Sequence, residues 1–267
     1  MNYYKATVQY DVTNYFGFQW QKGIPTVQHD FNQSLQLLMS GRITTMSASR
    51  TDTGVHAIEQ IVKITSERPI ECESFLTQLN KALPLQIRCL GLVPINGSFK
   101  PTTGSISKEY RYLFTNRLQS SCVDQKFIAN NPYKLDVSIM KKCAQEIVGK
   151  HDFRNFCSAG SNVKTTVRDI FSCDLSEVDP HAVLPRSDMF LLPEDLRHCY
   201  QFRIEGSGFL KQMVRHLMSA LWLVGSGRMS PEEFTLLING PVKTKRLWKV
   251  ASPRGLYLYQ FKYALDA

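Results

Sequence analysis

Alternating apolar and polar residues open the chain and predict a strand. Between residues 3 and 10, YYKATVQY, every second residue from Tyr4 to Tyr10 suits a buried face. Over 27–40 the apolar residues instead recur every three to four positions, which predicts a helix with Thr26 as its N-cap and Gly41 as its stop. The following patterns predict two strands, a helix ended by a proline and a further strand, over 43–49, 57–65, 73–83 and 86–93.

The second half of the chain predicts the same order of elements. In a strand over 108–116, Tyr110 and Tyr112 alternate with Glu109 and Arg111, so the two pairs should occupy opposite faces. The remaining patterns predict a helix over 138–149, strands over 165–175 and 199–206, a long amphipathic helix over 208–225, a short helix opened by the capping box at 230–233 and a last strand over 255–263.

Each half therefore has the order β-α-β-β-α-β, which is typical of a ferredoxin-like fold. We predict an α+β protein built from two such subdomains with antiparallel or mixed sheets, covering 1–104 and 105–267. Two segments fit neither repeat and are interpreted as insertions in the second subdomain. They cover 150–164, which is polar and aromatic, and 176–198, a long loop with three prolines.

Composition and charge narrow the function classes. The 267 residues carry a formal charge of +9 and a pI near 9.2, which favours a polyanionic partner such as nucleic acid. Seven cysteines without C-x-x-C spacing argue against a zinc site and suit a reducing compartment. The N-terminal MNYYKATVQYD has no apolar core of a secretory signal, and the most apolar run, 213–224, is too short to span a bilayer. We expect a soluble, cytoplasmic protein without a zinc site.

The stretch SASRTDTGVHA, residues 47–57, contains Asp-Thr-Gly, the tripeptide of aspartic proteases. Those enzymes need two such carboxylates that share a proton, and this chain has no second copy of the motif. Arg50 also lies two positions before Asp52, on the same side of an extended chain, where its charge favours the ionised carboxylate. A homodimer could supply two motifs, but the polar flanks differ from those of such subunits, so a protease is disfavoured. An ionised Asp52 suits a nucleophile or a base better.

The same residues have a purely structural interpretation. An Arg50–Asp52 ion pair could simply bracket a loop. In the functional interpretation, Gly54 instead supplies the positive φ of a sharp turn that leaves Asp52 exposed at a strand end. Tyr110 could be a core tyrosine instead of a ring that stacks on a base, and Arg215 a surface arginine instead of a residue at a cleft edge.

Eight segments in order resemble the TruA family of tRNA pseudouridine synthases along nearly the whole chain. They are YDVTNYFGFQWQ (10–21), TVQ (26–28), SRTDTGVHA (49–57), KEYRY (108–112), GKHDFRNF (149–156), VRDI (167–170), GFLKQMVR (208–215) and PRGLYL (253–258). The family combines two ferredoxin-like halves around a central basic cleft. It isomerises uridine to pseudouridine in tRNA without a cofactor, typically as a homodimer, and its bacterial members act at positions 38, 39 and 40 of the anticodon stem-loop.

The resemblance implies a role for each matching residue. Asp52 would be the catalytic aspartate, Arg50 would hold the flipped-out nucleotide, Tyr110 would stack on the uracil, Arg215 would pair with the aspartate, and Leu256 would line the uracil pocket. A non-catalytic RNA-binding protein on the same scaffold is the alternative function.

Some positions depart from the family pattern. Thr53 replaces the usual alanine of RTDAG, and Val12 replaces the glycine of YDG. A basic segment near the C-terminus could contact tRNA phosphates or be a solvated surface. It contains Lys243, Lys245, Arg246, Trp248, Lys249 and Arg254.

Overall fold

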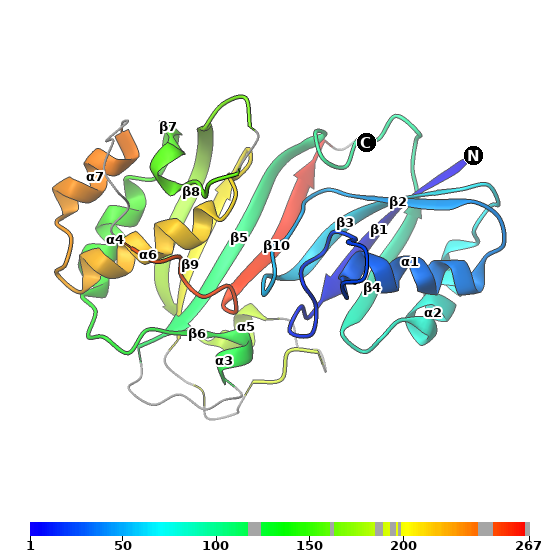
Figure 1. Ribbon diagram of the computed structural model, residues 1–267, viewed down its shortest axis with the longest axis horizontal. Helices are drawn as coiled ribbons and strands as arrows, with labels where there is room; N and C mark the ends of the chain where they lie inside the picture. Colours follow the sequence, from blue (N-terminus) through cyan, green and yellow to red (C-terminus); the bar gives the residue numbers. More distant parts are fainter. Residues whose placement is uncertain are drawn as a thin grey trace. The chain divides into compact units, whose positions relative to one another are not determined.

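The computed structural model describes residues 1–116, 124–160, 163–184, 189–192, 196, 199–239 and 248–264. The chain forms two compact units (Figure 1). The first unit contains Met1–Ile106, the stretch around Phe190 and the chain from Tyr257 onward, and the second contains most of the residues between 107 and 256. The subdomain boundaries of 1–104 and 105–267 stay a prediction.

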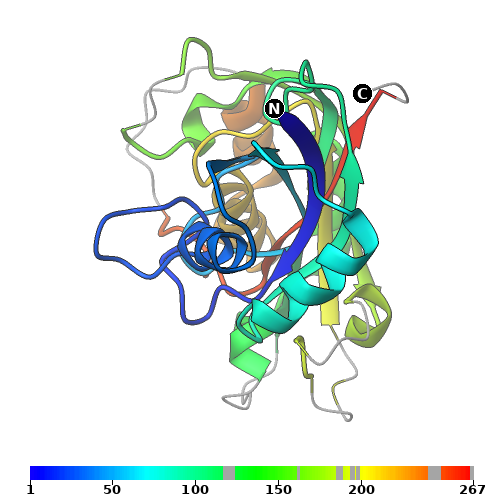
Figure 2. The ribbon, with the colours of Figure 1, turned by 90° about the vertical axis from the view of Figure 1, so that its right-hand side faces the viewer.

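The first unit is a four-stranded sheet with two helices. Along the chain come β1 (Asn2–Tyr10), α1 (Val27–Leu38), β2 (Ile43–Ser47), β3 (His56–Ser66), α2 (Cys72–Ala82) and β4 (Ile87–Pro94). The strand order is β4-β1-β3-β2 and all three pairings are antiparallel, which is the ferredoxin-like arrangement. The two helices pack against each other, and Figure 2 shows α1 nearly end-on.

The predicted alternation in β1 is confirmed. Tyr4, Ala6, Val8 and Tyr10 are all buried, whereas Lys5 and Thr7 between them are half-buried; Gln9 is buried as well, where the register with β3 shifts. The last strand of the chain, β10 (Leu256–Tyr263), adds to this sheet by pairing in parallel with the start of β3, at Tyr257 and Leu258. The sheet is therefore completed by residues from both ends of the chain.

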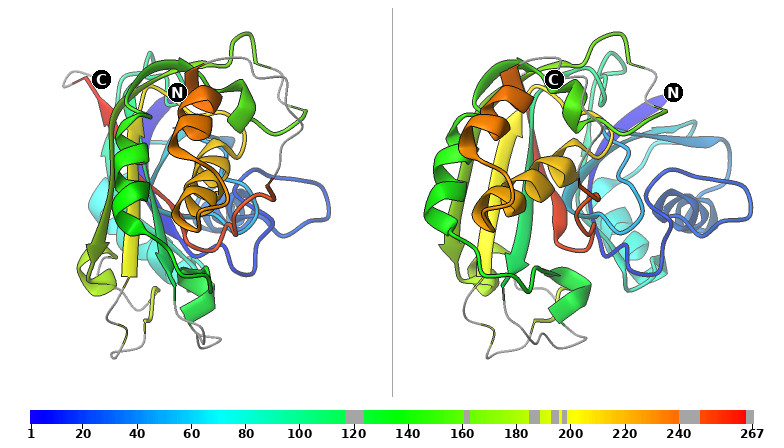
Figure 3. Two further views of the ribbon diagram at one scale, coloured as in Figure 1. Left: turned by 90° about the vertical axis from the view of Figure 1, so that its left-hand side faces the viewer. Right: turned by 60° about the vertical axis from the view of Figure 1, so that its left-hand side comes forward.

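The second unit is also a sheet covered by helices. Its strands β5 (Ser105–Thr115), β9 (Cys199–Gly206), β8 (Val167–Val178) and β7 (Gly149–Asp152) are antiparallel neighbours in that order, and β6 (Ala129–Asn130) pairs in parallel with β5. Figure 3 shows α4 (Val137–Gln145), α6 (Met213–Gly225) and α7 (Pro231–Asn239), which pack together. The short elements are α3 (Asp124–Phe127), the 3₁₀ helix η1 (Phe153–Phe156) and α5 (Pro180–Val183).

Local signals predicted most of these elements, and the α+β class is confirmed. The capping box of α7 is present, because the Ser230 backbone N–H donates to Glu233 Oε2 at 2.8 Å and the Glu233 N–H donates to Ser230 Oγ at 3.1 Å. The helix predicted over 208–225 is wrong at its start: it begins at Met213, because Gln212 has a left-handed backbone with φ 60°.

The two predicted insertions also carry regular structure. The first contributes most of β7 and η1, and β7 extends the second sheet at its edge. In the second, β8 continues to Val178 and α5 follows directly. Phe190 packs its ring edge-on against His56 and Tyr257 of the first unit.

Candidate active-site residues

Asp52 begins a tight turn at the entrance to β3. The Val55 N–H donates to the Asp52 carbonyl at 3.1 Å, and Gly54 has φ 80°. A positive φ at the third residue of a four-residue turn favours glycine, so the predicted role of Gly54 is confirmed. Thr53 is exposed and Asp52 is half-buried, so the turn holds the carboxylate at the protein surface.

Thr51, the residue before Asp52, anchors the turn to the protein interior. Thr51 is buried, and its Oγ1 lies 2.7 Å from the hydroxyl of Tyr10. Gln60 Nε2 donates to that tyrosine hydroxyl at 3.4 Å and to the Ser49 carbonyl at 2.9 Å, and the Ser49 N–H donates back to Gln60 Oε1 at 3.3 Å. These buried bonds tie the Asp52 turn to β1 and β3.

A glycine lets a second segment approach the same turn. Gly17 has φ 93°, and a Cβ at this position would lie 2.7 Å from the carbonyl oxygen of Thr51 and 3.2 Å from the carbonyl carbon of Asp52. The neighbouring Phe18 N–H donates to that Thr51 oxygen at 3.2 Å. The loop between β1 and α1 therefore packs its backbone directly on the backbone of the Asp52 turn.

Arg50 and Asp52 lie on the outer side of this segment. Arg50 is exposed, Thr51 is buried and Asp52 is half-buried, as the predicted alternation requires. Within the part of the chain that the structure describes, these two side chains form no ion pair with each other within 4.0 Å. The interpretation as a closed Arg–Asp pair is therefore wrong for this structure.

His56, also in the motif, is buried and makes two polar contacts through one nitrogen. Its Nδ1 lies 3.2 Å from Asp11 Oδ1 and 3.3 Å from the backbone nitrogen of Val12. A protonated Nδ1 donates to Asp11, whereas a bare Nδ1 accepts from Val12. Burial alone would raise the pKa of Asp11, but hydrogen bonds from His56 and Thr13 outweigh it and hold this pKa below its usual value.

Tyr110 lies in the second unit, on the face of β5 that packs against helices. It is 8% exposed, and the ring of Phe209 meets it edge-on at 5.1 Å between centroids. Lys108, two positions earlier, is half-buried. Burial, and then the positive charge of Arg168, lower the pKa of Lys108 below its usual value.

The other face of β5 carries a buried carboxylate. Glu109 is 1% exposed and accepts hydrogen bonds from Arg111 Nε at 2.7 Å and from Arg203 at 2.8 Å. Burial would raise its pKa, but the two guanidinium groups lower it overall. Arg111 therefore lies on the opposite face from Tyr110, as the alternation predicted, and is paired with Glu109.

Arg215 and Leu256 both lie in the second unit, Arg215 next to the segment 251–256 and Leu256 at its end. Arg215, in the first turn of α6, donates from Nε to the Ala251 carbonyl at 2.7 Å. Gly255 accepts from the Leu113 N–H at 2.8 Å, and a Cβ at Gly255 would lie 2.2 Å from the Leu113 oxygen, so only glycine fits. Leu256 follows this contact and is 4% exposed.

A hydrogen-bond relay that the sequence did not predict fixes the start of α6. Trp248 Nε1 donates to His216 Nδ1 at 3.3 Å, which leaves the proton of a neutral imidazole on Nε2. His216 Nε2 lies 2.9 Å from Ser158 Oγ, and Ser158 donates to Gln212 Oε1 at 2.5 Å. In this assignment each group donates one proton to the next, from Trp248 through His216 and Ser158 to Gln212, the residue with the left-handed backbone.

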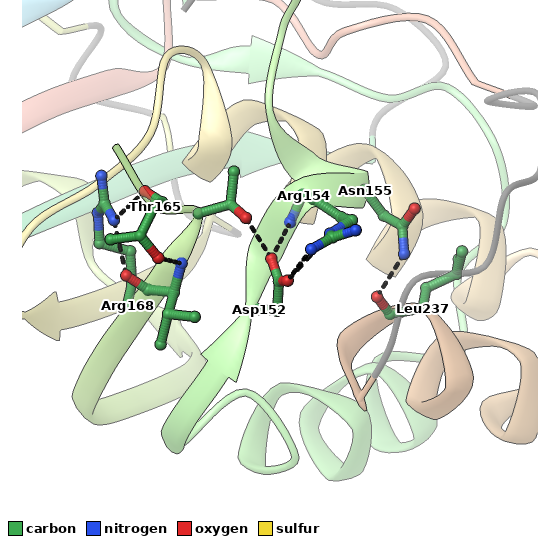
Figure 4. A network of polar contacts seen from close by, with 8 residues as sticks. Asp152, Arg154, Asn155, Thr165, Arg168 and Leu237 are labelled. Carbon is green, nitrogen blue, oxygen red and sulfur yellow. Dashed lines mark hydrogen bonds and ion pairs between the residues drawn. The ribbon is translucent and has the colours of Figure 1, made fainter. Parts of the chain in front are cut away.

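The GKHDFRNF segment forms a second polar network, shown in Figure 4. Asp152 accepts from Arg154 Nε at 2.9 Å, from the Arg154 backbone N–H at 3.2 Å and from the Thr166 hydroxyl. Asn155 donates to the Leu237 carbonyl at 2.9 Å, and Arg168 donates to the Thr165 carbonyl at 2.9 Å. This segment is thus fastened to β8 and α7.

The first unit therefore holds Arg50 and Asp52, and the second holds Tyr110, Arg215 and Leu256. Of the C-terminal basic segment, Lys249 and Arg254 are exposed, whereas Lys243, Lys245 and Arg246 lie outside the described residues. Over the described ranges, no three His, Cys, Asp or Glu side chains are grouped as a metal site would require. Among the helices described, none combines the length and hydropathy of a membrane span.

Comparisons with known proteins agree with the resemblance seen in the motifs. A sequence model of the family described as tRNA pseudouridine synthase matches residues 143–264. The chain is 33% identical over 264 residues to a protein named tRNA pseudouridine synthase A from Listeria innocua, an alignment that covers 98% of this chain and all of that protein.

Two further relatives bear the same name. The protein from Pseudothermotoga lettingae is 34% identical over 259 residues, and that from Bacillus pumilus is 31% identical over 261 residues. Each alignment covers 97% of this chain and 98% of the relative. The chain belongs to the TruA family of tRNA pseudouridine synthases, which are isomerases.

Proposed function

We propose that this chain isomerises uridine to pseudouridine at positions 38, 39 and 40 of the tRNA anticodon stem-loop, with Asp52 as the catalytic residue. The observation that carries the proposal is the Asp52 turn. A carboxylate in the Arg-Thr-Asp-Thr-Gly motif is held at the surface by a turn that buried hydrogen bonds brace on both sides. Such a group is fixed in position and reachable by an RNA substrate.

The reaction first requires that the target nucleotide leave the base stack, at a cost of about a few kcal/mol. Arg50, which is exposed beside Asp52, would hold the extruded nucleotide. Tyr110 would stack on the uracil, which offsets part of that cost. Arg215 would pair with the Asp52 carboxylate and orient it. These three assignments rest on the match of each residue to the family motifs.

Asp52 then has three routes open to it. The carboxylate can attack C1′ of the ribose, attack C6 of the uracil, or take a ribose proton to open a glycal route. In each case the N1–C1′ bond breaks, the uracil rotates, a C5–C1′ bond forms, and the proton lost from C5 balances the one gained at N1. Substrate and product are isomers, so no redox cofactor takes part. Leu256 would keep the pocket dry while the uracil is detached.

The test maps pseudouridine in unmodified tRNA incubated with the protein. Pseudouridine that is derivatised with carbodiimide stops reverse transcription, so new stops at 38, 39 and 40 are expected. Asp52→Asn should abolish them. The matched control is Asp136→Asn, because Asp136 caps α4 through the Ile139 N–H and asparagine caps helices equally well. No stops with the unaltered protein, or unchanged stops with Asp52→Asn, would refute the proposal.

The alternative is an RNA-binding protein without catalysis on the same scaffold. It predicts tRNA binding that weakens steeply between about 50 and 200 mM salt but no pseudouridine. The family resemblance also supports a cytoplasmic homodimer. Light scattering during size-exclusion chromatography would test the dimer, with a monomer mass counting against it.

A further inference from the structure

The loop between β1 and α1 points aromatic residues both inward and outward. Tyr15 and Phe18 are 7% and 0% exposed, whereas Phe16 and Trp20 are 55% and 50% exposed. The inner pair explains how the loop is anchored. Two half-exposed aromatic rings within five residues have no such structural explanation, and they suggest a binding surface.

Polar bonds on both flanks hold this loop in one conformation. Gln28 Oε1 accepts from the Trp20 backbone N–H and from Gln19 Nε2, both at 2.9 Å. The Tyr15 hydroxyl donates to Asp30 at 2.8 Å, and the Phe16 N–H donates to the Pro25 carbonyl at 2.9 Å. The outward rings are thus displayed on a braced frame, which lowers the entropy lost when they bind a partner.

The same loop touches the Asp52 turn. Gly17, directly after Phe16, packs against the backbone of Thr51 and Asp52, and Phe18 donates to the Thr51 carbonyl. Phe16 therefore leaves the backbone immediately beside the segment that carries the catalytic carboxylate. A nucleotide adjacent to one held at Asp52 would be within reach of this ring, because stacked bases repeat every ~3.4 Å along a strand.

We propose that Phe16 and Trp20 stack on unpaired nucleobases that flank the target uridine. This inference rests on the proposed function and deepens it. Aromatic side chains on rigid elements are the usual means of binding unstacked RNA bases without strict sequence preference. In sequence, the rings are interleaved with exposed polar residues, namely Asn14, Gln21 and Lys22, and only Ile24 in this loop is a further exposed large apolar residue. This interleaved surface suits a base with its phosphate better than an apolar protein patch, and the formal charge of +9 agrees with an RNA partner.

The stacking also has a consequence for substrate choice. When the target base is extruded, its neighbours in the strand lose a stacking partner, and rings that replace it stabilise the opened conformation. Because every base has a flat face, such contacts accept different neighbours.

The test measures the affinity of Asp52→Asn protein, which should not turn over, for an anticodon stem-loop RNA. One flanking nucleotide at a time is made abasic. We expect Phe16→Ala and Trp20→Ala each to weaken binding about 5- to 100-fold. At one or more flanking positions, removing the base should weaken binding when Phe16 and Trp20 are both intact. In one of the alanine variants the same abasic change should weaken binding much less, because the base and the ring that stack on each other form one interaction, which either change already removes.

Two controls separate stacking from damage to the fold. Leu37→Ala removes a 79% exposed apolar side chain from α1 of the same unit and should leave RNA affinity unchanged. Trp20→Phe should keep most of the affinity, because phenylalanine also stacks, while the tryptophan emission change on RNA binding is reduced. The inference would be overturned if Phe16→Ala and Trp20→Ala bound RNA as tightly as Leu37→Ala. It would also be overturned if the loss of affinity from every abasic change simply added to the loss from each alanine variant. Failure of the proposed function would instead appear as absent pseudouridine in active-site-intact protein.

Discussion

Replacing Gly17 with alanine should disturb the Asp52 turn from outside it. The new Cβ would lie 2.7 Å from the Thr51 oxygen, so the two segments must separate by about 0.7 Å to reach an ordinary contact of 3.4 Å. The positive φ of 93° adds a backbone cost of about 1–2 kcal/mol, and the overpacking about 1–3 kcal/mol. We therefore expect Gly17→Ala to lower the free energy of unfolding by about 2–5 kcal/mol.

Gly23→Ala is the matched control within the same loop. Gly23 also has a positive φ, 72°, but a Cβ there meets no atom within 4 Å. Only the backbone cost of about 1–2 kcal/mol applies, and the Asp52 turn stays in place. The difference between the two variants thus isolates the steric displacement of Thr51 and Asp52.

The assay combines urea unfolding with the rate of pseudouridine formation at a temperature where both variants are folded. A displacement of ~1 Å at catalytic groups can cost about a hundredfold in rate, so Gly17→Ala should lose tenfold or more. Gly23→Ala should keep a rate close to that of the unaltered protein. Equal stability and equal rates in the two variants would refute the claim that the Gly17 contact positions Asp52.

The two remaining predictions concern Gln212 and Asp11. Gln212→Gly should change the free energy of unfolding by less than about 1 kcal/mol, because relief of the left-handed strain offsets the lost bond to Ser158. Gln212→Val keeps the strain and loses the bond, so it should lower the free energy of unfolding by about 2 kcal/mol or more. Equal urea midpoints for the two variants would contradict this prediction. Asp11 has a lowered folded pKa, so its stabilisation is complete above the unfolded pKa near 4 and is lost as pH falls through the lower folded pKa. Asp11→Asn should flatten the acid limb of a stability-versus-pH curve, and an unchanged limb would exclude a role for the carboxyl.

The sequence predicts those features whose signal is local. The alternation from Tyr4 to Tyr10, the capping box at Ser230 and the turn glycine Gly54 each act within a few residues, and the structure confirms all three. Local periodicity failed at residues 208–212. The apolar spacing there suits a helix, but a bond from Ser158, 54 positions away, accompanies a left-handed backbone at Gln212.

The hydrogen bonds that brace the candidate site could not be predicted from local sequence either, because they join residues that are far apart in the chain. The Tyr10–Thr51 bond joins residues 41 positions apart, and the His216–Ser158 contact joins residues 58 apart. Taken singly, each of these residues is ordinary: a core tyrosine, a threonine and a serine in loops, and a buried histidine. Only the folded chain shows that they support the Asp52 turn and the start of α6.

The parallel pairing of β10 with β3 affects how the protein can be made. The strand partners Tyr257 and Leu258 leave the ribosome about 200 residues after His56 and Ala57. When residues 1–106 have been synthesised, the start of β3, next to the Asp52 turn, is therefore still unpaired on the side that β10 will occupy. His56 also lacks the ring of Tyr257, which stacks on it at 5.1 Å. The sheet that carries the Asp52 turn therefore cannot be completed before residues 257 and 258 have been synthesised, so its assembly depends on a contact between distant parts of the chain.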